Sequence, residues 1–360
     1  VAEINLSNNT LLGEIPAEIS LLTHLSILEL QHNLIQGAIP TELGLITDLV
    51  HLDIHKNQIT GTIPAEMYRL TQLQHLALGQ NGLVGTISSE IGYLTNLEYF
   101  HCQYNQLNGS IPSTIGFCTN LEYLVSYSNK LTGTIPTTIG FCNQLQYLNL
   151  VHNEITGNLP TEIGLMSNLE ILFVYMNKLR GSIPSEIGAL SSLEVMSLSN
   201  NVLSGSIPPT TLFRNQPNLT LFNVGTNFLT GSIPSSIGFA TSLETLHLDI
   251  NYFSGSLPTE LGLLQSLKTC LAYSNKLTDS IPSHIGNCHN LTELDVSSNL
   301  RMKGTLPSEI SELTNLERFL FKDTALSGTM PDEICSLRRD GNLTEIFSNR
   351  IVTCDCCMTC

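Results

Sequence analysis

The sequence predicts an α/β solenoid built from short parallel strands, and three observations support this prediction. A phrase of the form L-x-x-L-x-x-x-x-N-x-L-x-G-x-I-P, clearest at 121–136, recurs at a period of 24 residues along nearly the whole chain. The apolar positions before each Asn alternate with variable ones, as in a half-buried strand. The remainder of each copy, such as 137–144, is typical of a short helical or 3-10 turn. A fixed period of this length indicates stacked units, and about 14 are present.

An asparagine column marks the same point in every copy. The Asn amide carries donors and an acceptor, so it can satisfy backbone groups where the chain turns inward. Thr324 takes this position in the last copy. The column comprises Asn9, Asn33, Asn57, Asn81, Asn105, Asn129, Asn153, Asn177, Asn201, Asn227, Asn251, Asn275 and Asn299.

Gly and Pro follow each Asn at fixed places. The Gly predicts a bend that few side chains tolerate, and Asp279, which replaces it once, is among the residues that best accept such a backbone. The Ile-Pro step predicts an extended segment, and Ser88 is the one position where the proline is lost.

One copy is longer than the others. Between Gly205 and Gly231 the period is 26 residues, and Pro208 to Pro217 replace the usual P-x-E-I-G phrase. Insertions in repeat proteins map to loops on one face. We expect a bulge on the convex side, beside the helical turns; a loop that contacts a partner is the alternative.

Charge excludes two classes of partner. Lys plus Arg number 15 against 31 for Asp plus Glu, so the formal net charge is −16 and the field repels nucleic acid and anionic membrane surfaces. The sequence has no run of 18 apolar residues, so no membrane span is expected. The chain starts inside a repeat at Val1, and we expect an N-terminal cap to be missing. The predicted domains are a solenoid over 1–331 and a cysteine-rich cap over 332–360.

Ten cysteines form two sets. Cys335, Cys354, Cys356, Cys357 and Cys360 predict a disulfide-stapled cap in an oxidising compartment, with zinc binding as the alternative; their odd number leaves one unpaired within the set. The other five lie inside repeats, where buried free thiols are expected, although a Cys118–Cys142 disulfide is conceivable. This set is Cys102, Cys118, Cys142, Cys270 and Cys288. Six N-x-S/T sequons are candidate glycosylation sites, at Asn5, Asn8, Asn108, Asn218, Asn290 and Asn342.

The L-x-G-x-I-P phrase resembles the plant-type leucine-rich repeat of receptor-kinase ectodomains and polygalacturonase-inhibiting proteins. The resemblance covers Val1 to about Pro331. It implies a right-handed superhelix with a parallel concave sheet, a second small sheet formed by the G-x-I-P segments, and an extracellular role in recognition. The final I-C-S-L-R and C-D-C-C-x-T-C segments are similar to the tails of extracellular leucine-rich-repeat proteins of diatoms, and they differ from the plant cap.

Variable strand positions form the concave face. They lie one, two, four and six residues before each Asn, and seven of the ten tyrosines and seven of the ten histidines fall there. No charged residue occupies these positions from His75 through Thr226. An uncharged aromatic centre is typical of a binding hot spot, whereas β-propensity alone would explain only the Tyr and Val. The predicted ligand-binding residues are Tyr99, His101, Tyr104, Tyr123, Tyr127, Tyr147, His152, Phe173, Tyr175 and Met176.

The histidines suggest two further hypotheses. His51, Asp53 and His55 alternate on one strand with His75 on the next, so a metal site is conceivable, but exposed strand histidines are usually solvated and we expect no metal and no cofactor. A pH-sensitive interface is the favoured hypothesis, because seven imidazoles share the face.

No catalytic motif such as G-x-S-x-G, H-E-x-x-H or G-x-x-x-x-G-K-[ST] occurs, so the chain is not expected to be an enzyme. The predicted function is an extracellular recognition module, secreted or cell-surface, for a peptide, protein or glycan. The alternative is a structural or adhesive protein that associates with itself or with wall polymers, and a co-receptor is a further conceivable partner. A third, less favoured function is ice binding through a hydroxyl ladder that Glu14, Ala38 and Asn158 interrupt. The ladder is Thr62, Thr86, Ser110, Thr134, Ser182, Ser206, Ser232, Ser256, Ser280, Thr305 and Thr329.

Overall fold

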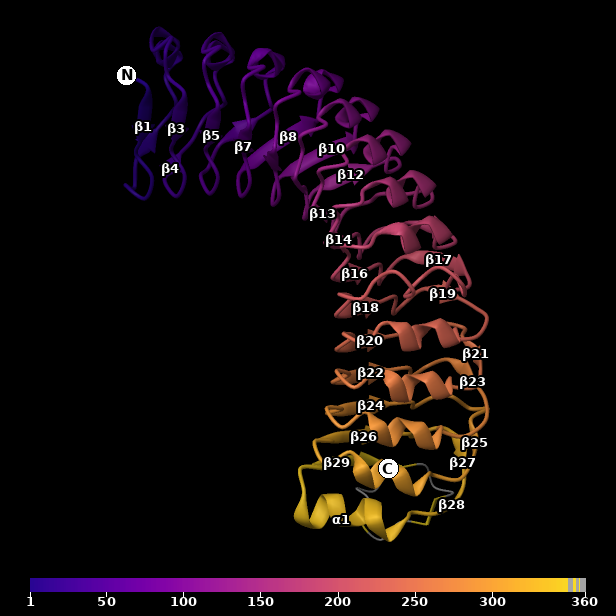
Figure 1. Cartoon of the computed structure of the whole chain (residues 1–360). Coiled ribbons are helices and arrows are strands. Elements are labelled where there is room, and N and C mark those ends of the chain that lie inside the picture. Colours follow the sequence, from indigo (N-terminus) through magenta and orange to yellow (C-terminus); the bar gives the residue numbers. More distant parts are fainter. Residues whose placement is uncertain (349–351, 354–355, 357–360) are drawn as a thin grey trace. The chain divides into compact units, whose positions relative to one another are not determined.

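The computed structural model describes residues 1–348, 352, 353 and 356 (Figure 1). The chain divides into two compact units, Val1–Leu179 (unit 1) and Arg180–Cys360 (unit 2). Of the cysteines predicted to form the cap, Cys354, Cys357 and Cys360 lie outside the described residues.

Unit 1 contains a parallel sheet to which each repeat contributes one three-residue strand. Residues one period apart pair, so Tyr99 lies beside Tyr123 and Tyr123 beside Tyr147. Side chains at equivalent positions therefore form straight rows across the strands. In sheet order the strands are β1 (Glu3–Asn5), β3 (Ile27–Glu29), β5 (His51–Asp53), β7 (His75–Ala77), β9 (Tyr99–His101), β11 (Tyr123–Val125), β13 (Tyr147–Asn149) and β14 (Ile171–Phe173).

Short 3-10 helices cover the other side of unit 1, at the top of Figure 1 where the strands lie below them. Most begin after a proline in the extended conformation, such as Pro112 at φ −68°. Ser88 adopts the same backbone at φ −67° and its side chain accepts a hydrogen bond from Glu90 N. The helices are η1 (Ala17–Leu21), η2 (Thr41–Leu45), η3 (Ala65–Arg69), η4 (Ser89–Tyr93), η5 (Ser113–Phe117), η6 (Thr137–Phe141) and η7 (Thr161–Leu165).

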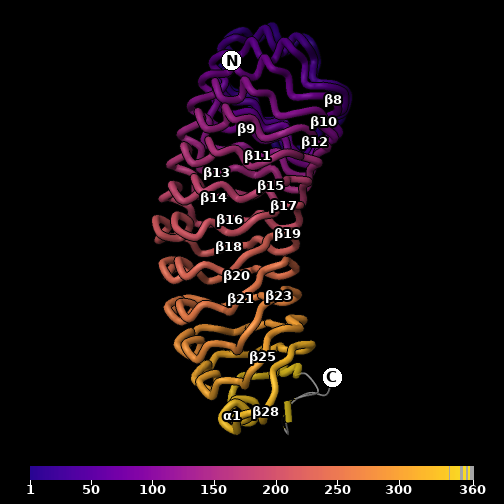
Figure 2. Tube along the Cα trace, turned by 90° about the vertical axis from the view of Figure 1, so that its right-hand side faces the viewer, coloured from indigo at the N-terminus to yellow at the C-terminus, as the bar shows by residue number. Residues whose placement is uncertain are grey.

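A second row of short strands flanks the main sheet of unit 1, as Figure 2 shows for β8, β10 and β12 beside β9, β11 and β13. It comprises a four-stranded sheet and the pair β2–β4. The resemblance implied such a sheet over the G-x-I-P segments; the strands instead lie slightly earlier in each copy and end no later than one residue after the Gly. The strands are β2 (Leu12–Gly13), β4 (Leu34–Ile35), β6 (Thr60–Gly61), β8 (Gly82–Thr86), β10 (Gln106–Ser110) and β12 (Lys130–Thr132).

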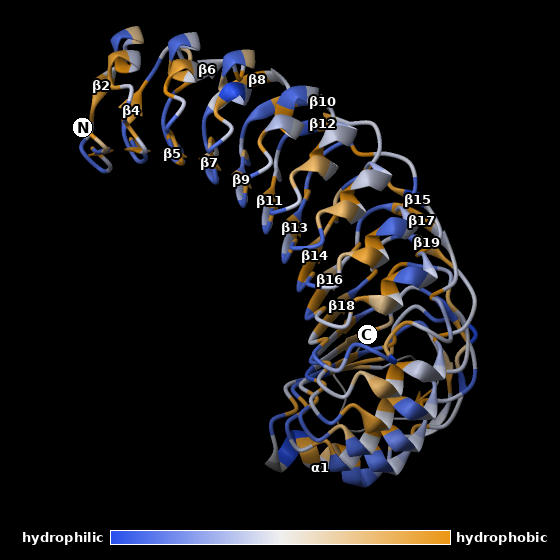
Figure 3. Ribbon diagram, turned by 45° about the horizontal axis from the view of Figure 1, so that its top comes forward, coloured by the Kyte–Doolittle hydropathy of each residue, from blue (hydrophilic) through white to orange (hydrophobic). Residues whose placement is uncertain are grey.

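Leucine columns and the Asn ladder fill the space between these layers, and orange and blue segments alternate along each coil in Figure 3. Leu121 and Leu131 are fully buried. Asn153 Nδ2 donates to the carbonyls of Ser126, Leu150 and Val151, and its Oδ1 accepts from Leu131 N. One amide thus joins two repeats and satisfies backbone groups that the turn leaves unpaired.

Unit 2 repeats the same plan. Its sheet strands are β16 (Val195–Ser197), β18 (Leu221–Asn223), β20 (Thr245–His247), β22 (Thr269–Leu271), β24 (Glu293–Asp295), β26 (Arg318–Leu320) and β29 (Glu345–Phe347). Its 3-10 helices are η8 (Ser185–Ala189), η9 (Ser235–Phe239), η10 (Thr259–Leu263), η11 (Ser283–Asn287) and η12 (Ser308–Glu312). The flanking strands are β15 (Arg180–Gly181), β17 (Val202–Gly205), β19 (Phe228–Leu229), β21 (Ser254–Gly255), β23 (Lys276–Leu277), β25 (Lys303–Gly304), β27 (Ala325–Leu326) and β28 (Gly328–Thr329).

The longer repeat replaces its 3-10 helix with consecutive turns over 209–215. Thr211 Oγ1 donates to Ser185 O and Gln216 Nε2 donates to Ile187 O, so the segment lies against η8 on the side of the helical turns. Strand pairing on the opposite side is unaffected, with Val195 beside Leu221. The two additional residues are absorbed without shifting the sheet.

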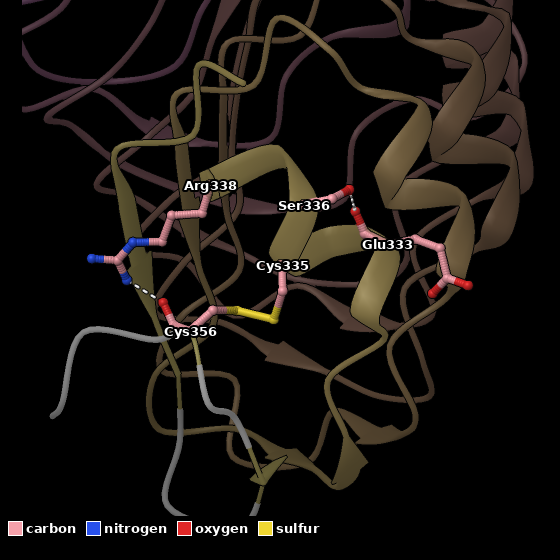
Figure 4. Close-up of a disulfide and its surroundings, with 5 residues drawn as sticks. All are labelled: Glu333, Cys335, Ser336, Arg338 and Cys356. Carbon is pink, nitrogen blue, oxygen red and sulfur yellow. Dashed lines mark hydrogen bonds between the residues drawn. A yellow bond between two sulfur atoms is a disulfide. The ribbon is translucent and has the colours of Figure 1, made fainter. Parts of the chain in front are cut away.

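The last described segment of unit 2 begins with the helix α1 (Asp332–Asp340). A disulfide joins Cys335 on this helix to Cys356, and Arg338 Nη1 donates to Cys356 O (Figure 4). Strand β29 pairs in parallel with β26, and β30 (Val352–Thr353) pairs with β28. A disulfide in the segment predicted as the cap is therefore present.

The predicted fold class is confirmed: both units are leucine-rich-repeat solenoids with parallel sheets and 3-10 turns. Within the described residues, fifteen strands of the main type occur, one more than the number of predicted repeats, because β29 arises in the segment that the sequence marks only as a cap. Asp279 at the Gly position has φ +59°, as its tolerance of this backbone predicts.

Candidate ligand-binding face

The candidate site lies on the sheet face of unit 1, defined as the solvent side of β1 to β14, away from the 3-10 helices. The first and third residues of each strand point to this face and the middle residue points into the core. On β9, Tyr99 and His101 are therefore half-buried whereas Phe100 is buried. Charged residues are missing between β7 and β14 at these positions, which leaves an apolar and hydrogen-bonding surface.

An aromatic column crosses this face because the first residue of successive strands is aromatic and the strands pair in register. His51 stacks on His75 at 4.2 Å between ring centroids. His75 is 5.3 Å from Tyr99, Tyr99 is 4.9 Å from Tyr123, and Tyr123 is 6.0 Å from Tyr147. Phe173 on β14 ends the column with an edge contact to Tyr147 at 6.1 Å. Parallel and edge contacts at these distances are the favoured geometries of aromatic pairs.

Polar residues anchor the hydroxyl groups of the column. Tyr99 Oη donates to Glu122 Oε2 at 3.3 Å, and Tyr123 Oη donates to Gln146 Oε1 at 3.4 Å. Tyr147 Oη accepts from Asn149 Nδ2 at 3.1 Å. These contacts fix the ring orientations, and the repeat pattern alone does not single out Glu122, Gln146 or Asn149 as the partners. The signal available was that Glu122 and Gln146 directly precede a strand whose first residue is Tyr.

A second group lies at the edge of the face. Tyr104 contacts Tyr127 edge-on at 5.0 Å, and Tyr175 contacts Phe173 at 5.9 Å. Tyr104 and Met176 are half exposed. They share with His152 a left-handed backbone, with φ between 52° and 55°, that occurs directly before the Asn of each copy. The structure therefore gathers all ten predicted ligand-binding residues on one face of unit 1.

Histidines extend the face beyond the column. Burial and the neighbouring His51 and His101 lower the pKa of His75 to about 4, and burial also lowers the pKa of His101. On β20 of unit 2, burial lowers the pKa of His247 as well. The lowered pKa values of His75, His101 and His247 argue against the hypothesis of an interface at which all the variable-position histidines titrate together.

Asp53 is the buried acid beside these imidazoles. His55 Nδ1 lies 2.7 Å from Asp53 Oδ1, and His55 N donates to the same oxygen at 3.0 Å. Burial raises the pKa of Asp53, but the hydrogen bonds from His55 outweigh burial and the net pKa is lowered. His55 Nε2 lies 3.0 Å from His32 Nε2. Among the described residues, His51, Asp53 and His75 form a group whose potential ligand atoms lie close enough together to share a metal ion.

The other predicted sites lie outside the aromatic column. Cys102, Cys118, Cys142, Cys270 and Cys288 are free and buried, which confirms the expectation of free thiols and shows no Cys118–Cys142 disulfide. The six sequon asparagines are exposed. None of the helices in the described part of the chain has the length and apolar character of a membrane span.

Comparison with known proteins identifies the family. The family profile of the leucine-rich repeat matches residues 1–22, 48–70, 96–118, 144–166 and 192–212. A leucine-rich-repeat protein of Leptospira interrogans, LIC12759, is 32% identical and has a TM-score of 0.67; the match covers 98% of this chain and 91% of that one. Among curated proteins, none matches the chain.

Two plant proteins are also similar. The plant peptide hormone receptor RGFR1, solved in complex with RGF2, is 33% identical with a TM-score of 0.87, over 98% of this chain and 59% of that one. A plant ice-binding protein is 29% identical with a TM-score of 0.56, over 65% of this chain and 76% of that one. The chain spans about half to two thirds of the length of the plant receptor ectodomains that it matches. It belongs to the leucine-rich-repeat family, and its repeats are of the plant receptor-ectodomain type.

Proposed function

We propose that the chain is an extracellular recognition module that binds an extended peptide, or a peptide segment of a protein, on the sheet face of unit 1. The observation that carries the proposal is the aromatic column from His51 to Phe173. It presents a continuous row of rings, and hydrogen bonds hold the hydroxyl groups of Tyr99, Tyr123 and Tyr147. From β7 to β14 no strand residue that points to the face is charged, and Glu122, which holds Tyr99, directly precedes β11.

The chemistry of this face matches the demands of peptide recognition. Ordered tyrosines offer large contact areas at a low entropic cost, because their orientation is set before the ligand arrives. Exposed aromatic patches on soluble proteins commonly mark interaction sites. The likeness to a plant receptor in complex with a peptide supports the same class of ligand. A glycan, which also stacks on tyrosine rings, and self-association are outcomes that the test below separates.

An extracellular place is proposed on three observations. They are the likeness to receptor ectodomains, the Cys335–Cys356 disulfide and the six exposed sequons. The repeat scaffold is typical of binding proteins without catalytic activity.

The test uses random peptide display against the chain, followed by titration of selected peptides. The chain has no Trp, so the fluorescence of a Trp placed in the peptide reports binding without a protein background. The variant Tyr123→Ala/Tyr147→Ala/Phe173→Ala should lose most of the affinity, since hot-spot aromatics each contribute about 2 kcal/mol or more. The matched control is Tyr93→Ala/Phe117→Ala/Phe141→Ala, which removes three more exposed rings from the side of the 3-10 helices.

Equal peptide affinity in the unaltered chain and in Tyr123→Ala/Tyr147→Ala/Phe173→Ala would contradict the proposed location of the binding site. Selection of no peptide, together with binding of an immobilised glycan, would overturn the ligand class. A molecular mass that rises with concentration would favour the adhesive alternative.

A second candidate function, ice binding, rests on hydroxyls that flank the Gly column. Thr62, Thr86, Ser110 and Thr134 form an exposed row in unit 1, and Thr60 on β6 and Thr132 on β12 are exposed beside it. The likeness to a plant ice-binding protein favours testing it. Thermal hysteresis that disappears in Thr62→Lys/Thr134→Lys would support this function, and its absence in the unaltered chain would exclude it.

A further inference from the structure

We infer that His51, Asp53 and His75 form a binding site for a divalent transition-metal ion of the zinc, nickel or copper class on β5 and β7. The inference does not depend on the proposed peptide binding. It goes against the expectation from sequence that no metal site is present, and it rests on geometry that only the folded chain reveals.

The first argument is convergence. His51 and His75 are direct partners in the sheet, and Asp53 follows His51 on the same side of β5. One potential ligand atom from each residue lies within 4.8 Å of the others. Two imidazole nitrogens and one carboxylate oxygen favour borderline transition-metal ions over Mg²⁺ and Ca²⁺, which prefer oxygen ligands alone. Three protein ligands leave at least one coordination position open.

The second argument is that buried polar atoms at this place lack partners. His51 Nε2 is buried without a hydrogen bond and lies 3.5 Å from Glu29 Oε1. His101 Nε2 on β9, the strand next to β7, is likewise buried and unpaired, and so are Gln31 Oε1 and Gln103 Oε1, which follow β3 and β9 by two residues. Among the described residues, these four are all but one of the buried side-chain atoms without a partner. Such atoms are costly and call for a bound ion or water.

The third argument is the support around the carboxylate. Both the ring and the backbone N–H of His55 hold Asp53 Oδ1, which fixes the carboxylate beside the two imidazoles. Partners of this kind orient metal ligands and tune their affinity. Asp53 and Glu29 together supply negative charge for a divalent cation.

The chain contains a natural control for this inference. The sequence His-Leu-Asp occurs at 51–53 and again at 247–249. On β20 the neighbours of His247 are Asn223 and Leu271, neither of which is an imidazole or a carboxylate. The same tripeptide thus lacks a second imidazole in unit 2, where it also lies two residues further along its strand: His247 is the last residue of β20, whereas His51 is the first residue of β5.

The experiment titrates the metal-stripped whole chain with Co²⁺ and follows the d–d absorption, with Zn²⁺ as a competitor. We expect one site whose spectrum lacks thiolate-to-cobalt charge-transfer bands, which separates it from any site built on cysteines. His75→Gln and Asp53→Asn should each weaken binding by about 100-fold, and His55→Gln, which removes a supporting residue, by about 10-fold. His247→Gln should leave the affinity unchanged.

Two results would overturn the inference. One is the absence of saturable Co²⁺ or Zn²⁺ binding at millimolar concentrations. The other is binding with the same affinity in His75→Gln, Asp53→Asn and the unaltered chain, with circular dichroism showing that both variants are folded. A spectrum with thiolate bands would assign the metal to cysteines instead.

Discussion

The hydroxyl oxygen of Tyr68 accepts a hydrogen bond from the backbone N–H of Ser88 at 3.3 Å. Tyr68 stands where η2, η4, η5 and η6 have Gly, and Ser88 stands where the other copies have Pro. A proline has no N–H to donate. The two departures from the repeat therefore belong together. The buried hydroxyl of Tyr68 needs a hydrogen-bond donor, and position 88 can supply its backbone N–H only because it is not proline.

This pairing predicts that restoring the consensus at position 88 destabilises the chain. Ser88→Pro removes the donor and places Cδ of the ring toward Tyr68 Oη, so we expect a loss of about 1–2 kcal/mol in the free energy of unfolding. Tyr68→Phe should cost about 1 kcal/mol. A double-mutant cycle by urea unfolding checks both values, and additive losses would contradict the coupling.

Asn153 tests the Asn ladder. Its amide serves three carbonyls and one backbone N–H, so Asn153→Ala leaves several nearly buried groups unpaired and should cost about 2–4 kcal/mol. Thr161→Ala, an exposed change in the same repeat, is the control and should stay within about 0.5 kcal/mol of the unaltered chain. A loss at Asn153 no larger than at Thr161 would show that the ladder is not structurally important.

Gln216 is expected to hold the longer repeat in place. It is fully buried, its Nε2 donates to Ile187 O at 2.8 Å, and its Oε1 accepts from Phe213 N at 3.2 Å. Gln216→Ala should therefore cost about 2–4 kcal/mol and increase amide hydrogen exchange over 209–215. Asn218→Ala, in an exposed position two residues later, is the comparison.

The five free thiols should be inert in the folded protein. Burial raises the pKa of Cys102, Cys118 and Cys142, and of Cys270 and Cys288, to about 12. The thiolate that reacts with alkylating agents is therefore scarce at neutral pH. Mass spectrometry after iodoacetamide treatment should find these five unmodified in the native chain and modified in urea. Native labelling of any of them would contradict the burial.

His247 predicts a dependence of stability on pH. Burial lowers the pKa of this imidazole in the folded state, so the unfolded state binds more protons below the ordinary value of about 6.5. Stability is then highest above that pH and falls as pH drops toward the lowered pKa. Unfolding curves at about pH 7.5 and 5.5 should show a smaller acid-induced loss in His247→Gln than in the unaltered chain. Equal losses would contradict the assignment.

The sequence was sufficient to predict the sheet and its face because both follow from two periodicities. The 24-residue repeat sets which residues pair, and alternation within each strand sets which side chains point outward. The rows containing Tyr99, Tyr123 and Tyr147 could therefore be assigned before the structure was known. The roles of the thirteen Asn and of the Gly positions could be predicted for the same reason. Each Asn satisfies backbone groups at the turn and each Gly permits the bend, and both requirements recur in every repeat.

Contacts that occur only once could not be predicted in this way. The sequence places His51, His55 and His75 equally near Asp53. Side-chain rotamers decide which of them forms a hydrogen bond with Asp53 and which only lies beside it, and the sequence does not give the rotamers. Gln216 lies in the copy where the pattern is broken, so no other repeat shows what its side chain contacts. The partnership of Tyr68 with Ser88 joins two exceptions 20 residues apart, and neither exception alone indicates the other.

The longer repeat shows that the number of residues in a repeat can change without a change in the pairing or spacing of its strands. Two residues were added on the side of the helical turns, and Val195 still lies opposite Leu221. Duplication or deletion of one 24-residue repeat would likewise leave the pairing of the remaining strands intact. It would change the distance between the proposed metal-binding histidines and the tyrosines by one strand spacing, about 4.8 Å. Copy number can therefore adjust the reach of the binding face in discrete steps without a new fold.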